Sequence, residues 1–191
     1  MQLCTQSGLL KQVFFLSSPN HDNRPDDTEI SLIVIHNISL PPEQFGSDHI
    51  NQLFTNCLDE NEHPFFAEIS HLRVSSHVLI RRNGQIIQYV PFHKRAWHAG
   101  VSCFRGAEVC NDFSVGIELE GTDTSDFCNI QYIVLAKLIE CLQLAYPNLS
   151  RELVTGHEHI SPDRKTDPGP HFDWAKLSEL IGVALPANAD E

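Results

Sequence analysis

The sequence predicts a single α/β domain in which a mixed central β-sheet is flanked by helices. Two observations carry this prediction. Short β-prone runs are interspersed with amphipathic helical segments, and the 191 residues suffice for one sizeable core. No repeat, low-complexity tract or linker divides the chain. We therefore expect one domain over residues 1–191, with the informative motifs in 18–185 and a polar tail in 186–191.

The first half of the chain predicts a buried strand, a helix and a hairpin. Residues 31–36 (SLIVIH) form an apolar run ending in a polar residue, the pattern of a central strand as it reaches the sheet edge. From Ile50 to Leu58, apolar side chains recur at helical spacing behind a Ser-Asp cap, which predicts an amphipathic helix. Residues 76–82 and 85–91 are β-prone and flank an Asn-Gly pair, which predicts a hairpin.

The second half begins with a strand over 114–121 (SVGIELEG). Its alternation places Val115, Ile117 and Leu119 on one face, and the carboxylates of Glu118 and Glu120 on the other. Helical periodicity then returns until a proline ends it. The remaining predicted elements are a helix over 130–145, a last strand over 153–159 and a closing helix over 172–185.

Charge and hydropathy exclude several classes of partner. The formal net charge is −12, from 25 acidic and 13 basic residues, so the field of the molecule repels polyanions. We therefore expect neither nucleic acid nor an anionic membrane surface as a partner. No segment holds the roughly 20 uninterrupted apolar residues that a membrane span needs.

The N-terminus and the cysteines favour a cytoplasmic protein. Lys11 and Gln12 interrupt the N-terminal apolar stretch, which lacks a basic start and a clear cleavage site. The cysteines are scattered without a CxxC pair, so we interpret them as reduced thiols. Their even number leaves a disulfide set open as the less favoured alternative. They are Cys4, Cys57, Cys103, Cys110, Cys128 and Cys141.

Three side chains form a candidate metal site. His36 ends the first predicted strand, His157 lies in a His-Glu-His segment, and Asp167 follows ten residues later in a loop stiffened by prolines. Two imidazoles and one carboxylate are a common ligand set for catalytic zinc. Each could equally be a satisfied polar residue at a strand end, and spacing alone does not decide between these interpretations. No HExxH helix or zinc-deaminase pattern is present.

Ordered motifs from Ser18 to Trp174 carry a resemblance to a known family. They are SPNHDNRPDD, IVIHNISLPP, the hairpin at Asn-Gly, RAWHAGVSCF, CNDFSVGIELEGTD and GHEHISPDRKTDPGPHFDW. With them the chain resembles the AmpD-type cytoplasmic 1,6-anhydro-N-acetylmuramyl-L-alanine amidases, which are related to phage lysozyme amidases and peptidoglycan recognition proteins. The resemblance implies the α/β fold that these amidases and recognition proteins share. It also implies one catalytic Zn²⁺ held by His36, His157 and Asp167, with His159 in a structural role.

The same resemblance implies that Glu118 is the acid/base residue and that Lys165 stabilises developing charge. The chemistry fits, since amide hydrolysis needs a base for water and a cation beside the oxyanion. From the residues alone, Glu118 could instead lie on a solvated strand face, as Glu120 could, and Lys165 could be an ordinary surface lysine.

Further positions resemble substrate contacts of the family. Trp97 offers a flat wall for a sugar or peptide, although a core tryptophan is equally compatible with the sequence. The segment before CND departs from the family pattern GRxRCND, because Ala107 and Val109 stand where arginines are usual. Arg105 either substitutes from a shifted position, or preference for the stem peptide changes. The predicted substrate-binding residues are Asn37, Arg73, Trp97, His98, Arg105 and Asp112.

The resemblance thus implies a monomeric, zinc-dependent amidase. It would cut the bond between (1,6-anhydro-)N-acetylmuramic acid and L-alanine in muropeptides during cytosolic cell-wall recycling. By family analogy, it would also lower the signal that induces a chromosomal β-lactamase. Two alternatives stay open: a muropeptide-binding module without catalysis, and an exported wall-lytic amidase.

Overall fold

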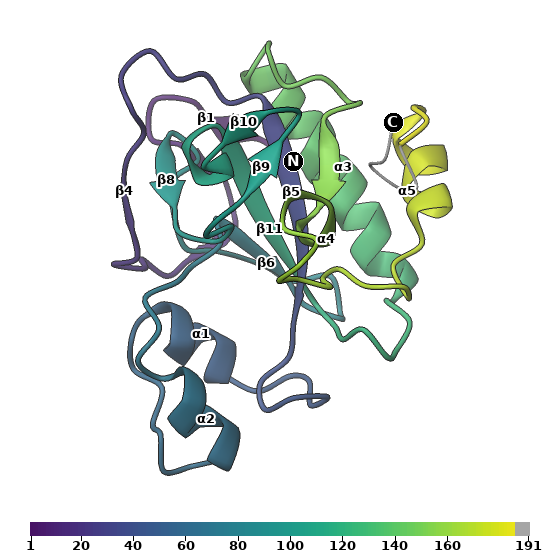
Figure 1. Ribbon diagram of the computed structural model, residues 1–191. Helices are drawn as coiled ribbons and strands as arrows, with labels where there is room; N and C mark the ends of the chain where they lie inside the picture. Colours follow the sequence, from purple (N-terminus) through teal and green to yellow (C-terminus); the bar gives the residue numbers. More distant parts are fainter. Residues whose placement is uncertain (186–191) are drawn as a thin grey trace.

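A six-stranded mixed sheet forms the centre of the computed structural model, which describes residues 1–185 (Figure 1). In spatial order the strands are β12 (Val154–Gly156), β5 (Leu32–Ile38), β11 (Ser114–Glu120), β6 (Val78–Ile80), β7 (Ile86–Gln88) and β3 (Phe14–Phe15). Strands β12, β5, β11 and β6 lie side by side and are mutually parallel. Strands β6 and β7 form an antiparallel pair, and β3 joins β7 in parallel.

Strand alternation gives the sheet two different faces. On β11, Val115, Ile117 and Leu119 belong to the main apolar core, which also contains the buried side of α3 (Asn129–Ala145) and of α5 (Trp174–Ile181). The intervening residues of β11 point to the opposite face. Figure 1 shows α3 running along the sheet with α5 outside it. The polar side chains of the central strands therefore face away from these two helices.

A small helical lobe covers part of the polar face. Helices α1 (His49–Phe54) and α2 (Pro64–Ile69) share a second apolar cluster with residues of β6 and β7. Sequence reasoning missed α2, although a signal was present: Pro64 occupies its first turn, and the His63 side chain caps it by accepting from the Phe65 backbone N–H. Figure 1 shows the lobe beside one end of the sheet.

Short elements complete the described chain. None of the helices within residues 1–185 is long and apolar enough to cross a membrane. All six cysteines are free thiols, as the sequence analysis favoured. The remaining elements are β1 (Leu3–Cys4), β2 (Leu9–Leu10), β4 (His21–Asn23), β8 (Lys94–Ala96), β9 (Cys103–Phe104), β10 (Ala107–Glu108), the 3₁₀ helix η1 (Cys110–Asp112) and α4 (His157–Ile160).

The predicted α/β class and the hairpin at Asn83-Gly84 are confirmed, whereas several boundaries were wrong. The strand predicted to end at His36 continues to Ile38, because β11 pairs with it along its full length. The last strand stops at Gly156, and the following residues form α4. The closing helix ends at Ile181, because Gly182 adopts a left-handed conformation there. The predicted tail, 186–191, lies outside the described residues.

Candidate active site

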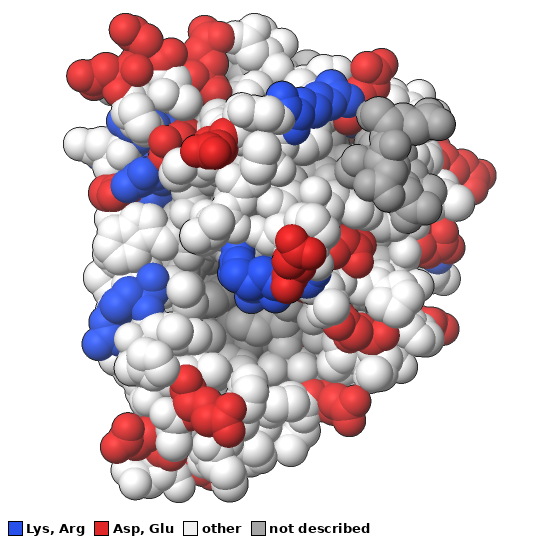
Figure 2. All heavy atoms as spheres, viewed as in Figure 1, with Lys and Arg blue, Asp and Glu red and all other residues white. Residues whose placement is uncertain are grey.

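A pocket of about 380 Å³ opens on the polar face of the sheet. Figure 2 shows the surface hollowed between the α1–α2 lobe and the segment around α4. Strands β5 and β11 supply its floor, and the two lobe helices supply an apolar wall. The lining residues that carry polar or titratable groups include His36, Asn37, Ser75, Ser76, His98, Glu118, His157, Lys165 and Asp167.

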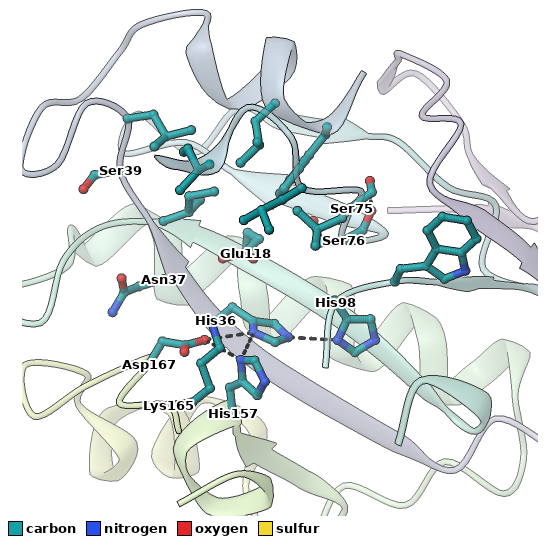
Figure 3. A pocket seen from close by; sticks show the side chains of 18 of the residues that line it. His36, Asn37, Ser39, Ser75, Ser76, His98, Glu118, His157, Lys165 and Asp167 are labelled. Carbon is teal, nitrogen blue, oxygen red and sulfur yellow. Dashed lines mark hydrogen bonds and ion pairs between the residues drawn. The ribbon is translucent and has the colours of Figure 1, made fainter. Parts of the chain in front are cut away.

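Three of the predicted residues meet at the pocket's base. His36 comes from β5, His157 begins α4 directly after β12, and Asp167 belongs to the loop after α4. His36 Nδ1 lies 3.0 Å from His157 Nδ1 and 2.9 Å from Asp167 Oδ2, and His157 Nδ1 lies 3.1 Å from the same oxygen. Figure 3 shows the three side chains converging. The topology thus joins residues 121 and 131 positions apart.

The electrostatics of the cluster fit a divalent cation. Burial lowers the pKa of His36 to about 4, so its imidazole is neutral at neutral pH. Burial opposes ionisation of Asp167, but the two neighbouring imidazoles outweigh it and hold its pKa below the ordinary value. His157 Nε2 lies 3.0 Å from the carbonyl oxygen of Ala99, an acceptor only, so a ring that donates to this oxygen has a lone pair on Nδ1 to offer a cation in place of its contact with Asp167.

The donor set also fits zinc. Neutral imidazoles and a carboxylate are its usual ligands, and three protein ligands leave a fourth position open in a catalytic site. Zinc-ligand bonds of about 2.0–2.2 Å separate tetrahedral ligand atoms by about 3.3–3.6 Å. The three atoms here lie 2.9–3.1 Å apart, so a small outward shift of the side chains would admit the ion. His36, His157 and Asp167 could therefore hold one zinc ion.

Glu118 is a buried carboxyl group beside this cluster. It is paired in register with His36 across the parallel β5–β11 ladder, so both side chains point to the same face. Its side chain lines the pocket, and its Oε2 atom has no hydrogen-bond partner among residues 1–185. Burial and the charge of Asp167 raise the pKa of Glu118 well above its ordinary value, although Lys165 opposes the shift. A carboxyl group with a raised pKa is a better base than an ordinary glutamate, which suits it to accepting a proton.

Glu120 corrects one expectation. The sequence left Glu120 open as a solvated strand residue, but it is buried and its Oε1 lies 2.9 Å from Nη1 of Arg81. The same carboxylate accepts hydrogen bonds from the backbone N–H groups of Gly46 and Arg82. Glu118 and Glu120 thus share a face of β11 but differ in their partners.

The loop carrying Lys165 and Asp167 is fastened to the sheet. Asp123 accepts a hydrogen bond from Asn37 at 2.6 Å and one from the Thr166 hydroxyl at 2.6 Å. Asn37 also donates to the carbonyl oxygen of Pro168 at 2.9 Å. These bonds hold the loop so that Lys165 and Asp167 face the pocket, as Figure 3 shows. Asn37, predicted as a substrate contact, also lines the pocket, and its amide nitrogen takes part in this fastening.

The other predicted substrate residues divide into two groups. Trp97 and His98 line the pocket, and His98 Nδ1 lies 3.0 Å from His36 Nε2. Arg73, Arg105 and Asp112 are not among the lining residues. Arg73 is exposed and donates to nearby backbone carbonyls, Arg105 is exposed at the tip of the β9–β10 hairpin, and Asp112 accepts a hydrogen bond from Arg95 at 2.6 Å.

Sequence reasoning missed the apolar wall of the pocket. Periodicity marked α1 as amphipathic but could not show that its apolar side reaches the site. The structure adds α2 and the segment that follows it. The apolar lining residues are Ile38, Leu40, Leu53, Phe54, Phe65, Ile69, Leu72 and Val74. This wall can exclude water from one side of a bound ligand.

Comparisons with known proteins agree with this geometry. Residues 26–170 match the family model of N-acetylmuramoyl-L-alanine amidase. The chain is 59% identical over 164 residues to the 1,6-anhydro-N-acetylmuramyl-L-alanine amidase AmpD of Escherichia coli K12, covering 86% of this chain and 89% of that protein. A crystal structure of a selenomethionine AmpD derivative superimposes with a TM-score of 0.91 at 55% identity, covering 95% and 99% of the two chains.

A more distant structure was solved with a ligand. It is the E. coli amidase AmiD in complex with the substrate anhydro-N-acetylmuramic acid-L-Ala-D-γ-Glu-L-Lys. The TM-score is 0.59 at 30% identity, covering 85% of this chain and 62% of that one.

Proposed function

Because the chain belongs to the N-acetylmuramoyl-L-alanine amidase family, we propose that it is a zinc-dependent enzyme of cytoplasmic cell-wall recycling. Family membership makes it an amidase. Its substrate would be a muropeptide, cut between 1,6-anhydro-N-acetylmuramic acid and L-alanine. The observation that carries the proposal is the convergence of His36, His157 and Asp167 beside the buried Glu118 in one pocket. That the enzyme is a monomer stays a prediction.

The residues suit the hydrolysis of an unactivated amide. When bound, zinc would supply Lewis-acid polarisation of the scissile carbonyl and make water a competent nucleophile at neutral pH. Glu118 accepts the proton of the attacking water and delivers it to the nitrogen of L-alanine as the C–N bond breaks. Its raised pKa suits both halves of this transfer, because the carboxyl can take the proton and hold it.

Lys165 places a positive charge in the same pocket. Negative charge develops on the carbonyl oxygen only as the transition state forms, so an ammonium group aimed there lowers the barrier without tightening ground-state binding. Trp97 and the apolar wall contributed by α1 and α2 bind and desolvate the rest of the substrate. Arg105 remains a proposed contact for the anionic end of the stem peptide.

Mass spectrometry of the reaction products tests this function. Purified protein is incubated with an anhydromuropeptide of defined sequence, and in parallel with the corresponding muropeptide bearing a reducing sugar. We expect the anhydro substrate to yield a free peptide that begins with L-alanine and a sugar whose lactyl group now ends in a free carboxylate. A protein that binds the muropeptide but releases neither product would be a binding module, and the proposed catalytic roles would fall.

A further inference from the structure

The two imidazoles of the proposed metal centre present Nδ1 to the cluster, so each must carry its hydrogen on Nε2 to leave a lone pair free. For His157, the carbonyl oxygen of Ala99 at 3.0 Å can only accept, so it favours hydrogen on Nε2. Asp167 Oδ2, 3.1 Å from Nδ1, and the Nη2 donor of Arg164, 3.4 Å from Nε2, favour the other tautomer, so the Ala99 contact must outweigh both. For His36, the Nε2 atom faces another imidazole, Nδ1 of His98, at 3.0 Å. Either ring could donate across this contact, so its direction must be set elsewhere.

Ser114 sets that direction. Its hydroxyl donates to the carbonyl oxygen of Cys110 at 2.5 Å, and its Oγ atom lies 3.3 Å from His98 Nε2. Since the carbonyl accepts only, the serine hydrogen is committed to it and the serine oxygen accepts from His98 Nε2–H. His98 Nδ1 then has a lone pair and accepts from His36 Nε2–H, which opposes the tautomer in which His36 Nδ1–H would donate to Asp167 Oδ2 at 2.9 Å and leaves Nδ1 available to a cation.

The space around His98 preserves this chain of hydrogen bonds. A Cβ atom on Gly116 would lie 2.4 Å from Cγ of the His98 ring, so the absence of a side chain there makes room for the imidazole. Figure 3 shows His98 extending toward His36. Ser114 and Gly116 belong to the same face of β11 as Glu118, so one strand supplies both the base and the platform under His98.

One amide oxygen holds both orienting groups. Oδ1 of Asn111 accepts hydrogen bonds from the backbone N–H of His98 at 3.1 Å and of Ala99 at 2.8 Å. The dipeptide His98-Ala99 supplies the imidazole that contacts His36 and the carbonyl that contacts His157. Displacing Asn111 would therefore disturb the orientation of both histidines at once.

We propose that Asn111 and Ser114 are positioning residues that fix the tautomers of both metal-binding histidines through the His98-Ala99 dipeptide. The proposal rests on the metal centre assigned under the proposed function. Loss of partners of this kind typically weakens metal binding 10- to 100-fold. Ser114 acts on His36 alone, whereas Asn111 acts on both histidines. This difference separates the roles of the two residues.

Two measurements on matched variants test the proposal. Nitrogen-15 NMR of labelled histidines in the metal-free protein reports each tautomer, and competition with a chromophoric chelator gives the Kd for zinc. In the unaltered protein we expect hydrogen on Nε2 of both His36 and His157. In Ser114→Ala we expect His36 alone to lose its defined tautomer and the zinc Kd to rise about 10-fold or more. In Asn111→Leu we expect both histidines to be affected.

Two control variants distinguish a loss of positioning from a general effect of substituting a residue in this region. Asn111→Asp retains an accepting oxygen and should keep the zinc Kd within about threefold, well short of the loss expected when the partner is removed. Ser102→Ala removes another buried serine, which bonds Gly100 and Cys110 but neither histidine, and should leave both tautomers unchanged.

An unchanged His36 tautomer and zinc Kd in Ser114→Ala would overturn the role of Ser114, and a zinc Kd in Asn111→Asp as weak as in Asn111→Leu would overturn that of Asn111. If Asn111→Leu does not fold, a zinc Kd raised 10-fold or more in Asn111→Asp would overturn the role of Asn111 instead. A protein with the expected tautomers that cleaves no muropeptide would contradict the proposed function and leave the positioning intact.

Discussion

Glu118 and His36 occupy paired positions on neighbouring parallel strands, β11 and β5, and point to the same face of the sheet. The pairing places a carboxyl with a raised pKa next to a residue of the candidate metal cluster. Both positions lie on regular strands with fully buried neighbours such as Ile35 and Ile117, which suits a site that needs precise geometry.

Glu118→Gln tests the role of the carboxyl as the proton carrier. Glutamine keeps the shape of the side chain but cannot accept the water proton, so kcat should fall by about 10²- to 10⁴-fold. Zinc content should stay at the level of the unaltered protein, because Glu118 is not part of the cluster. Steady-state rates with metal analysis of the same samples check this. A variant with more than a tenth of normal kcat would contradict the assignment.

Lys165→Ala tests charge stabilisation. Because the ammonium is proposed to act on charge that develops in the transition state, kcat should drop by about 10²- to 10³-fold while KM changes little. Lys176→Ala, on α5 and outside the pocket, is a suitable control for loss of a lysine. If Lys165→Ala raised KM and left kcat intact, Lys165 would be a substrate-binding residue instead.

The stability of the metal-free protein should reveal the buried, unpaired state of Glu118. Its folded-state pKa lies above the ordinary value of 4.5, so as pH rises past that value the folded state retains a proton that the unfolded state has lost. The contribution of Glu118 to stability therefore becomes increasingly unfavourable with rising pH. Glu118→Gln should raise Tm relative to the unaltered protein at neutral pH, and the gain should vanish below about pH 4.5.

Glu120→Gln provides the opposite case on the same strand. Glu120 is paired with Arg81, and both side chains are nearly inaccessible, at 3% and 10% exposure. Removing one partner of such a pair leaves an uncompensated charge and should lower the free energy of unfolding by about 3–5 kcal/mol. Denaturant unfolding of the two variants at pH 7 would show changes of opposite sign. Destabilisation by both would mean that the Glu118 carboxyl has an unrecognised partner.

The sequence predicted best what local patterns determine. Strict alternation over 114–121 predicted the two faces of β11, and the Asn-Gly pair predicted the β6–β7 hairpin. The three metal-binding candidates followed from residue chemistry and a family resemblance, and the fold brings them together. Their contact depends on the β12–β5 pairing, which no spacing in the sequence reveals.

Long-range partners were beyond the sequence. Nothing local indicates that Glu120 meets Arg81, 39 positions away, or that Asn37 reaches Asp123, 86 positions away. These contacts make Glu120 a member of a buried ion pair, and they give the Asn37 amide nitrogen a part in holding the loop of Lys165 and Asp167. The predicted end of the last strand, β12, was wrong for a related reason, because a strand ends where its pairing with the neighbouring strand stops.

Arg105 is the predicted substrate contact most open to test. It lies exposed at the β9–β10 turn with its guanidinium 5.2 Å from the Phe104 ring centre, outside the pocket lining. If it grips the anionic end of the stem peptide, Arg105→Ala should raise KM several-fold with kcat unchanged, and salt should reduce the difference. Kinetics with peptides of different length would locate the contact. If Arg105→Ala and the unaltered protein had equal KM values for every peptide, Arg105 would not be a substrate contact.

Metal removal and replacement test whether His36, His157 and Asp167 hold a zinc ion that hydrolysis requires. The protein is stripped with a chelator, assayed for peptide release from a defined anhydromuropeptide, and assayed again after stepwise addition of zinc. Peptide release should disappear on stripping and return in full at one zinc per chain, and Asp167→Ala should fail to recover at that stoichiometry. Undiminished peptide release by protein shown to be free of metal would contradict a zinc-dependent reaction.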